Sequence, residues 1–161
     1  MKQIKKTRLG QWLLGVFCLA LVLTAAGILS SQPGDSIVSR VISQQEAGKE
    51  TFDWGTFHTY HQGTSYGTKD VLTGVAVIKP GMEIHPPHVH AEEEYLMVLA
   101  GQGTWHLNGK TFSARKGDIL YASPWDIHGI KNTGETALEF VVWKWNSKGV
   151  ALVPEPAKEK K

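Results

Sequence analysis

Histidines and glutamates are concentrated in one short stretch, HPPHVHAEEEY, which begins at residue 85. The whole chain of 161 residues has only 7 His and 15 acidic residues, so this stretch is unusually rich in groups that bind metals. In an extended segment the side chains alternate between two faces, which places His88 and His90 on the same face. After a short bend, Glu94 can join that face at the start of the next strand. Three possible ligands therefore point toward one place.

Two imidazoles and a carboxylate that converge inside a protein are costly unless a partner satisfies them, because burying such groups unpaired costs several kcal/mol. A metal ion satisfies all three at once, and it needs neutral His and ionised Glu, which a pH near 7 supplies. A fourth group comes from the stretch GDILYASPWDIHGIKN, residues 117–132. There His128 follows a turn at Pro124, which makes it the candidate fourth ligand.

The elements that position these residues are expected to be strands. Short β-rich runs are bounded by Gly, Pro, Asn and Asp, and no stretch after residue 50 shows a sustained helical period. The strands that we expect are Val71–Ile78, Tyr95–Ala100, Thr104–Leu107, Lys110–Ala114, Ile119–Ala122, Gly129–Lys131 and Thr136–Trp145. Asn108-Gly109 predicts a type I′ hairpin, because both residues tolerate positive φ. Turns every eight to twelve residues indicate an all-β antiparallel sandwich or barrel.

The ligand candidates lie in two motifs that resemble those of the cupin family. In this sequence the first motif reads Gly-x6-His-x-His-x3-Glu-x6-Gly and consists of Gly81, His88, His90, Glu94 and Gly101. The second motif consists of Gly117, Pro124, His128 and Asn132. The resemblance covers about residues 68–146. Two loop lengths depart from the usual pattern. Gly81 lies one residue further from the first His, and the gap from Pro124 to His128 is one shorter, with Asp126 where a glycine is usual.

The resemblance implies a single jelly-roll barrel with one divalent metal inside it, held by His88, His90, Glu94 and His128. Of the three glutamates only Glu94 has the family's spacing, so Glu92 and Glu93 are expected to be solvated loop residues. His85 is expected at the rim of the site. Imidazole and carboxylate ligands suit Fe, Mn, Ni, Cu or Zn, and the residue types do not choose among these metals.

Aromatic residues near the second motif are candidates for the wall of a pocket. Tyr121 and Trp125 flank the approach to His128. Val141, Trp143 and Trp145 are expected on the same face of the last strand. This face can be interpreted as core packing or as an aromatic wall above the metal. Tyr121 and His106 are the candidates for a proton-transfer group.

The N-terminus predicts export. Four cations, Lys2, Lys5, Lys6 and Arg8, precede an apolar segment over residues 9–29. Either this segment is a signal peptide cleaved near Ala25-Ala26-Gly27, or it remains as a membrane anchor. In both cases positive charge at the front keeps the N-terminus cytoplasmic, so the remainder is expected in the periplasm or anchored outside the cytoplasm. The expected organisation is residues 1–30 as this helix, 31–50 as a linker with a short helix at Ser36–Gln45, 51–150 as the barrel and 151–161 as a tail.

The charge and the cysteine content exclude some classes of function and of metal ligand. The formal net charge is +2 from 17 basic and 15 acidic residues. Four of the basic residues precede the apolar segment, so residues 31–161 carry 13 basic and 15 acidic groups, a net of −2. This domain has no Lys/Arg stripe for nucleic acid. Cys18, the single cysteine, lies in the apolar segment, which leaves the barrel no disulfide and no thiolate ligand.

Cupins include dioxygenases, decarboxylases, lyases, isomerases and proteins that only bind, so the family alone does not give the reaction. We expect a metal-dependent enzyme of the dioxygenase or lyase type acting on a small organic substrate. The alternatives are a non-catalytic module that binds a small molecule or a metal at the membrane, and an accessory protein for a membrane partner. A homodimer paired through sheet edges is also expected.

Overall fold

The structure is a computed structural model that describes residues 37–157 of the chain. The apolar segment at residues 9–29, expected to be an export signal or anchor, lies outside the described residues. Within residues 37–157 there is no helix long and apolar enough to cross a membrane.

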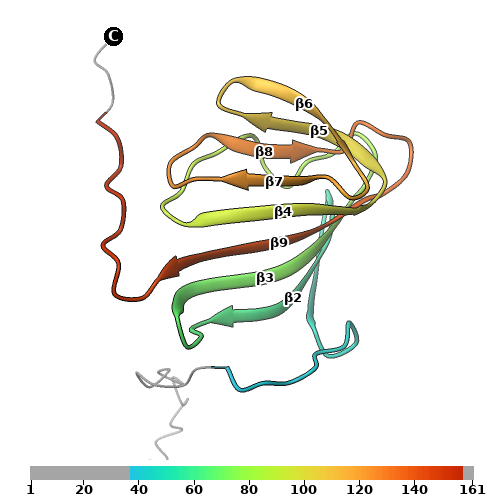
Figure 1. Cartoon of the computed structure of the whole chain (residues 1–161). Coiled ribbons are helices and arrows are strands. Elements are labelled where there is room, and N and C mark those ends of the chain that lie inside the picture. The colour runs from blue at the N-terminus through green and yellow to red at the C-terminus, as the bar shows by residue number, and fades with distance from the viewer. Residues whose placement is uncertain (1–36, 158–161) are drawn as a thin grey trace, which may run out of the picture. The chain divides into compact units, whose positions relative to one another are not determined.

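The described residues form strands and turns, and residues 37–157 contain no helix. The strands are β1 (Gly48–Phe52), β2 (Gly55–Gly63), β3 (Thr68–Ile78), β4 (Glu93–Ala100), β5 (Gln102–Leu107), β6 (Lys110–Arg115), β7 (Ile119–Ala122), β8 (His128–Lys131) and β9 (Leu138–Ser147). They build a six-stranded sheet in the order β1-β2-β3-β9-β4-β7 and a three-stranded sheet in the order β6-β5-β8 (Figure 1). Their pairings are antiparallel, as the sequence predicts.

The turns that join these strands follow from their residues. Asn108 and Gly109 have φ of 48° and 76°, and Leu107 pairs with Lys110 across them, so the predicted hairpin between β5 and β6 is confirmed. Gly101 joins β4 to β5 with φ of 76°. A Cβ at Gly101 would lie 2.3 Å from the carbonyl oxygen of Ala137, so no other residue fits this turn without a shift of backbone.

The core lies between the two sheets. The six-stranded sheet contributes the buried residues Ala76, Ile78, Leu96, Val98, Leu120, Ala122, Leu138, Phe140 and Val142, and the smaller sheet contributes Trp105, Ala114 and Ile130. On β4 and the first half of β9 the buried residues alternate with more exposed ones, because successive side chains of a strand point to opposite faces. The parity of each strand therefore decides which residues can reach the interior.

The structure corrects two expectations for the region before residue 68. The strand β1 begins at Gly48, inside the segment expected to be a linker, and β2 follows in a region where no strand bounds were predicted. The described part of the helix expected over Ser36–Gln45 has no helix and only a turn at residues 44–46. In this turn the Glu46 carboxylate accepts hydrogen bonds from the backbone and hydroxyl of Ser43, at 2.8 and 2.7 Å, and the chain then enters β1.

Candidate metal centre

The loop between β3 and β4 carries two of the predicted ligands and is fastened to the strand that carries the third. The backbone N–H of His88 donates to the carbonyl of His128 at 2.9 Å, and the N–H of His128 donates to the carbonyl of His88 at 3.0 Å. This two-way bridge extends the edge of the three-stranded sheet beyond β8. It brings the first and second sequence motifs side by side.

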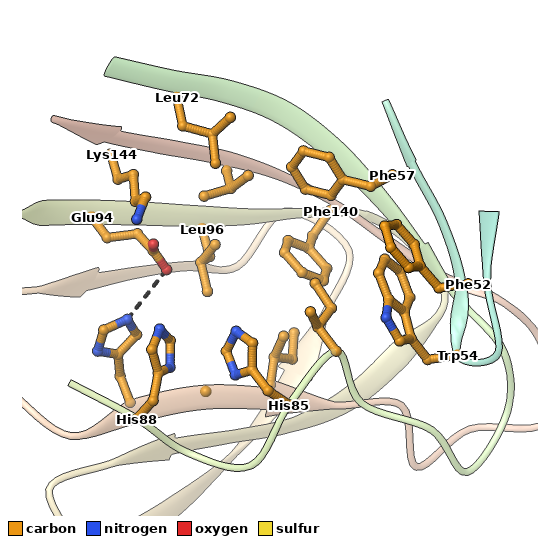
Figure 2. A pocket seen from close by; sticks show the side chains of 15 residues that line it. Phe52, Trp54, Phe57, Leu72, His85, His88, Glu94, Leu96, Phe140 and Lys144 are labelled. Atoms are coloured by element: carbon orange, nitrogen blue, oxygen red, sulfur yellow. Dashed lines mark ion pairs between the residues drawn. The ribbon is translucent and has the colours of Figure 1, made fainter. Parts of the chain in front are cut away.

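Four predicted ligands converge at this place. The rings of His88, His90 and His128 have centroids 4.8 to 5.1 Å apart, and one nitrogen from each ring lies within 4.8 Å of the others. Glu94, the second residue of β4, points to the same side, with one carboxylate oxygen 3.3 Å from Nε2 of His90 and the other 3.3 Å from Nε2 of His128. The dashed line at Glu94 in Figure 2 marks the second of these contacts.

Backbone carbonyls fix which ring nitrogen faces the centre. Nδ1 of His128 donates to the carbonyl of Asp126 at 2.8 Å, and Nδ1 of His90 donates to the carbonyl of Glu92 at 3.1 Å. Both rings therefore turn Nε2 toward Glu94. A hydrogen bond of this kind on the far nitrogen orients a histidine as a metal ligand.

The site contains polar atoms that the described residues leave without a hydrogen bond. Nδ1 of His88 is buried without a hydrogen bond, and Nε2 of His128, in a side chain that is only 1% exposed, has the Glu94 contact at 3.3 Å but no hydrogen bond. Buried polar atoms without partners are rare, since each costs about 1–3 kcal/mol. Ligands that lie about 2.1 Å from one ion stand about 3 Å apart, which is close to the carboxylate–imidazole distances here. The residues present therefore fit a metal ion.

The ionisation of His88 and of Glu94 suits a metal as well. Burial, followed by the neighbouring histidines, lowers the pKa of His88 to about 4, so its ring is neutral near pH 7. Burial alone would raise the pKa of Glu94, but the hydrogen bonds and charges of His128 and His90 outweigh it and lower this pKa to about 2. Burial opposes protonation of His128 too, yet Glu94 and the Asp126 carbonyl raise its pKa.

A cavity of about 260 Å³ opens beside this cluster, between the two sheets. Three groups of residues line it: the site residues His85, His88, Glu94 and His128; the cation Lys144; and an apolar wall of Phe52, Trp54, Phe57, Leu72, Ile84, Leu96, Gly129, Ile130, Phe140 and Val142. Figure 2 shows Glu94 and Lys144 toward one end and Phe52, Trp54 and Phe57 toward the other. The cavity is thus charged at the metal end and aromatic at the far end.

Comparison with known proteins identifies the family. The cupin-domain family model matches residues 74–144. A crystal structure of a protein from Thermotoga maritima, described as a predicted oxalate decarboxylase, superposes with a TM-score of 0.57 at 26% identity, and the match covers 66% of this chain and 99% of that one. This chain belongs to the cupin superfamily. The two antiparallel sheets are accordingly those of the cupin jelly roll, as the motifs predicted.

Two curated relatives are similar to parts of this cupin. One is described as an oxalate-binding protein of Thermotoga maritima and is 34% identical over 64 residues, which are 40% of this chain and 53% of the relative. The other is a gentisate 1,2-dioxygenase of a Streptomyces species, 26% identical over 80 residues, which are 49% of this chain and 22% of the relative. The chain spans about half the length of the first relative and less of the second.

Four residues predicted for the pocket or for proton transfer lie away from the cavity. Tyr121 is 41% exposed and donates its hydroxyl hydrogen bond to Glu93, at 2.9 Å. Trp143 is 36% exposed, because Val142 and Lys144 beside it take the inward positions on β9. His106 alternates with the buried Trp105 and so faces away from the core of the cupin. The fourth is Trp125.

Trp125 holds the loops of the site in place and does not line the cavity. Its backbone N–H donates to the carbonyl of His90 at 2.8 Å, and its φ of 69° is uncommon for a residue other than glycine. Its indole Nε1 donates to the carbonyl of Val153 at 2.7 Å, which fastens the C-terminal segment beside the site. Backbone strain of this kind persists where the surrounding contacts enforce it.

Glu92 and Lys144 are the site residues that the sequence analysis missed. Glu92 was expected to be solvated, but its side chain is only 20% exposed and lies 3.4 Å from Nδ1 of His90 and 3.5 Å from Nζ of Lys144. Lys144 pairs with Glu94 across β9 and β4 and lines the cavity. No local signal indicates Lys144, because its place depends on the register between β4 and β9, which are distant in the chain. Glu93 begins β4 on the outer face, and His85 lies exposed at the rim as expected.

Asn132, the last residue of the second motif, is a structural residue. It is fully buried, and its amide donates to the carbonyls of Ile78 and Thr136, each at 2.8 Å, while its side-chain oxygen accepts from the N–H of Gly134 at 2.9 Å. These bonds tie the ends of β3 and β8 to the turn before β9. Asn132 therefore holds together the strands between which the cavity lies.

Proposed function

We propose that this cupin is a metal-dependent enzyme, of the dioxygenase or lyase type, that acts on a small organic substrate. One observation carries the proposal: three histidines and a carboxylate converge at one end of an otherwise mainly apolar cavity. A structural metal site is normally closed by its ligands, whereas a catalytic site borders a space for substrate. The cavity beside Glu94 supplies that space.

The four converging side chains, His88, His90, Glu94 and His128, would hold the ion. A divalent transition metal in such a site supplies Lewis-acid activation and, with a redox metal, access to oxygen chemistry. The chain itself supplies the surroundings. The apolar wall excludes water, which strengthens every electrostatic interaction with a bound substrate. Outside the four ligand candidates, the titratable side chains on the described cavity wall are His85 and Lys144.

Turnover by metal-loaded protein tests this proposal. The full chain would be prepared with iron(II), manganese(II) or zinc(II) in turn and offered a panel of small organic acids, including oxalate and gentisate. Oxygen consumption and mass spectrometry would detect the products. We expect one metal form to convert a member of the panel, and His90→Ala to abolish the conversion. His106→Ala is the matched control, because it removes a histidine from the outside of the barrel and should leave turnover unchanged. Absence of turnover in all metal forms would contradict the enzymatic proposal.

The second candidate function is a non-catalytic module that binds a small molecule. It is favoured by the relative described as an oxalate-binding protein, which is 34% identical over the matched segment. Binding without chemistry raises the unfolding temperature in proportion to the logarithm of ligand concentration, and it yields no product. A ligand that stabilises the metal-loaded full chain by several degrees and is recovered unchanged would favour this function.

We further propose that the barrel works outside the cytoplasm, in the periplasm or on a membrane anchor. Four cations precede an apolar segment at residues 9–29, which is the pattern of a signal peptide or an anchor. A reporter enzyme that is active only outside the cytoplasm, fused after residue 161, should be active. The mass of the mature protein would then separate cleavage after Ala25-Ala26-Gly27 from retention of the segment. An inactive reporter would contradict export.

The homodimer also stands as a proposal. Within residues 37–157 the six-stranded sheet ends at β1 and β7 and the three-stranded sheet ends at β6 and β8. Unpaired strand edges favour pairing with a second chain. Light scattering of the full chain should give twice the monomer mass, and a monomer at micromolar concentration would contradict the proposal.

A further inference from the structure

Lys144 is the one lysine or arginine on the wall of the cavity within the described residues. It lies on β9 directly opposite Glu94 on β4 and opposite Leu72 on β3. Residues directly opposite each other in an antiparallel pair have Cβ atoms about 5 Å apart and point to the same face. The strand register therefore directs a lysine into the cavity next to a ligand of the candidate metal centre, as Figure 2 shows.

The ammonium group of Lys144 makes only one long contact with a charged group among the described residues. Its one charged partner among the described residues is Glu92, with Nζ to Oε1 at 3.5 Å, and the Lys144 side chain is 26% exposed. Glu92 is shared, because its other oxygen lies 3.4 Å from Nδ1 of His90. An ammonium has three donors. A single long contact leaves donors free for a ligand in the cavity.

The opposite end of the cavity is apolar. Phe52 and Trp54 stack with their ring centroids 4.9 Å apart and their planes at 10°, and Phe57 and Phe140 complete this wall. Phe140 is 2% exposed and belongs to the core, whereas Phe52 is 40% exposed at the edge of the cavity. A ligand that fills the cavity thus meets charges at one end and aromatic rings at the other (Figure 2).

We propose that Lys144 is the residue that selects the substrate, by binding a carboxylate, and that the substrate is a small carboxylate with an apolar or aromatic body. The inference rests on the proposed function, since it assigns the substrate class of the same site. Carboxylates form short charge-assisted hydrogen bonds with ammonium groups, and aromatic rings pack well on aromatic walls. The volume of about 260 Å³ lies just below the range of about 300–1,000 Å³ that holds drug-sized ligands, so the ligand is small.

This substrate class differs from oxalate, the ligand after which one relative, the oxalate-binding protein, is named. Oxalate carries two carboxylates and no apolar part, so it would leave the wall of Phe52, Trp54 and Phe57 without a partner. Benzoate presents one carboxylate and one ring, and it matches both ends of the cavity. Benzamide has nearly the same shape as benzoate and no charge, which makes it the matched neutral probe.

Calorimetric titration of the full chain with benzoate, benzamide and oxalate tests the proposal, with the metal content of each preparation measured alongside. We expect benzoate to bind at least ten times more tightly than benzamide and more tightly than oxalate. Lys144→Met keeps the apolar stem and removes the charge, and it should weaken benzoate roughly 10- to 100-fold while leaving benzamide unchanged. Lys144→Arg should retain binding, and Lys110→Met, at the exposed β5–β6 turn, is the matched charge control.

Glu92→Gln is the second variant, and it distinguishes selection from a structural ion pair. If Lys144 serves the ligand, removing the charge of Glu92 frees the ammonium, so benzoate should bind as tightly as before or more tightly. Equal weakening in Glu92→Gln and Lys144→Met would overturn the proposal. So would equal affinities for benzoate and benzamide, a preference for oxalate, or no binding of any probe. If metal is retained in such a failed test, the metal centre stands and only the substrate class falls.

Discussion

The two faces of the six-stranded sheet carry different chemistry, although the same strands build both. On the inner face, β4 presents Glu94 and β9 presents Phe140 and Lys144 to the cavity. On the outer face the same strands present aromatic residues, among them Tyr95, whose ring centroid is 4.8 Å from that of Tyr121 on β7 and 5.9 Å from that of Trp145. The comparison teaches that strand parity, rather than residue type, decides which side chains meet the metal centre.

Replacement of an aromatic residue on each face gives the largest expected contrast. Phe140→Ala removes a ring that is 2% exposed in the core and should destabilise the protein by about 3–5 kcal/mol. Trp143→Ala removes a larger ring that is 36% exposed and should cost about 1 kcal/mol or less. Urea unfolding of the two variants measures both values. Equal losses of stability would break the distinction between the faces.

The effect of pH on stability through His88, on the inner face, is expected to be smaller than that of Phe140→Ala. The pKa of His88 falls from 6.5 to about 4 on folding, so between these pH values the unfolded chain binds more protons. The contribution of the neutral His88 ring to the free energy of unfolding is therefore fully present above pH 6.5 and is lost as the pH falls toward 4. For a partly exposed ring we expect a loss of about 2 kcal/mol in metal-free protein.

Comparison with His88→Asn isolates this contribution. The raised pKa of His128 also makes stability depend on pH, but it does so in both the unaltered protein and the variant. Unfolding free energies at pH 7 and pH 4 should show a steeper fall in the unaltered protein than in the variant. Identical pH dependence of the two proteins would mean that the inner face does not hold His88 neutral.

The smallest expected effect is on the outer face. Tyr121→Phe removes only the exposed hydroxyl that donates to Glu93, so stability should fall by about 0.5 kcal/mol. Metal content and turnover should not change, because this side chain lies away from the cavity. A loss of turnover in Tyr121→Phe would return this residue to the catalytic role that the sequence suggested.

Spacing allowed much of the candidate site to be predicted. Glu94 and the three histidines were selected by their motif positions, and the structure brings these side chains together. The strands from β3 to β9 and the Asn108-Gly109 hairpin were predicted because turn residues bound them. Local sequence sufficed for these features, since each depends on residues that are near in the chain.

The wall of the cavity could not be predicted in the same way. The run FVVWKW on β9 is apolar at both parities, so alternation alone does not say which residues face inward. A lysine is usually found on the solvent-exposed face of a strand, yet the pairing of Lys144 with Glu94 places its side chain on the face that lines the cavity. Register between strands distant in sequence is set by the whole sheet. The strands β1 and β2, which bring Phe52 and Phe57 to the cavity, were missed for a related reason, because their residues are mostly polar or partly exposed.

The most direct test of the account is the metal stoichiometry of the full chain, purified without added metal and analysed by mass spectrometry beside His128→Ala and His106→Ala. The account predicts about one equivalent of a divalent transition metal in the unaltered protein and in His106→Ala, and none in His128→Ala. Equal metal in the two variants, or no metal in any of them even after reconstitution, would contradict a metal centre on the inner face.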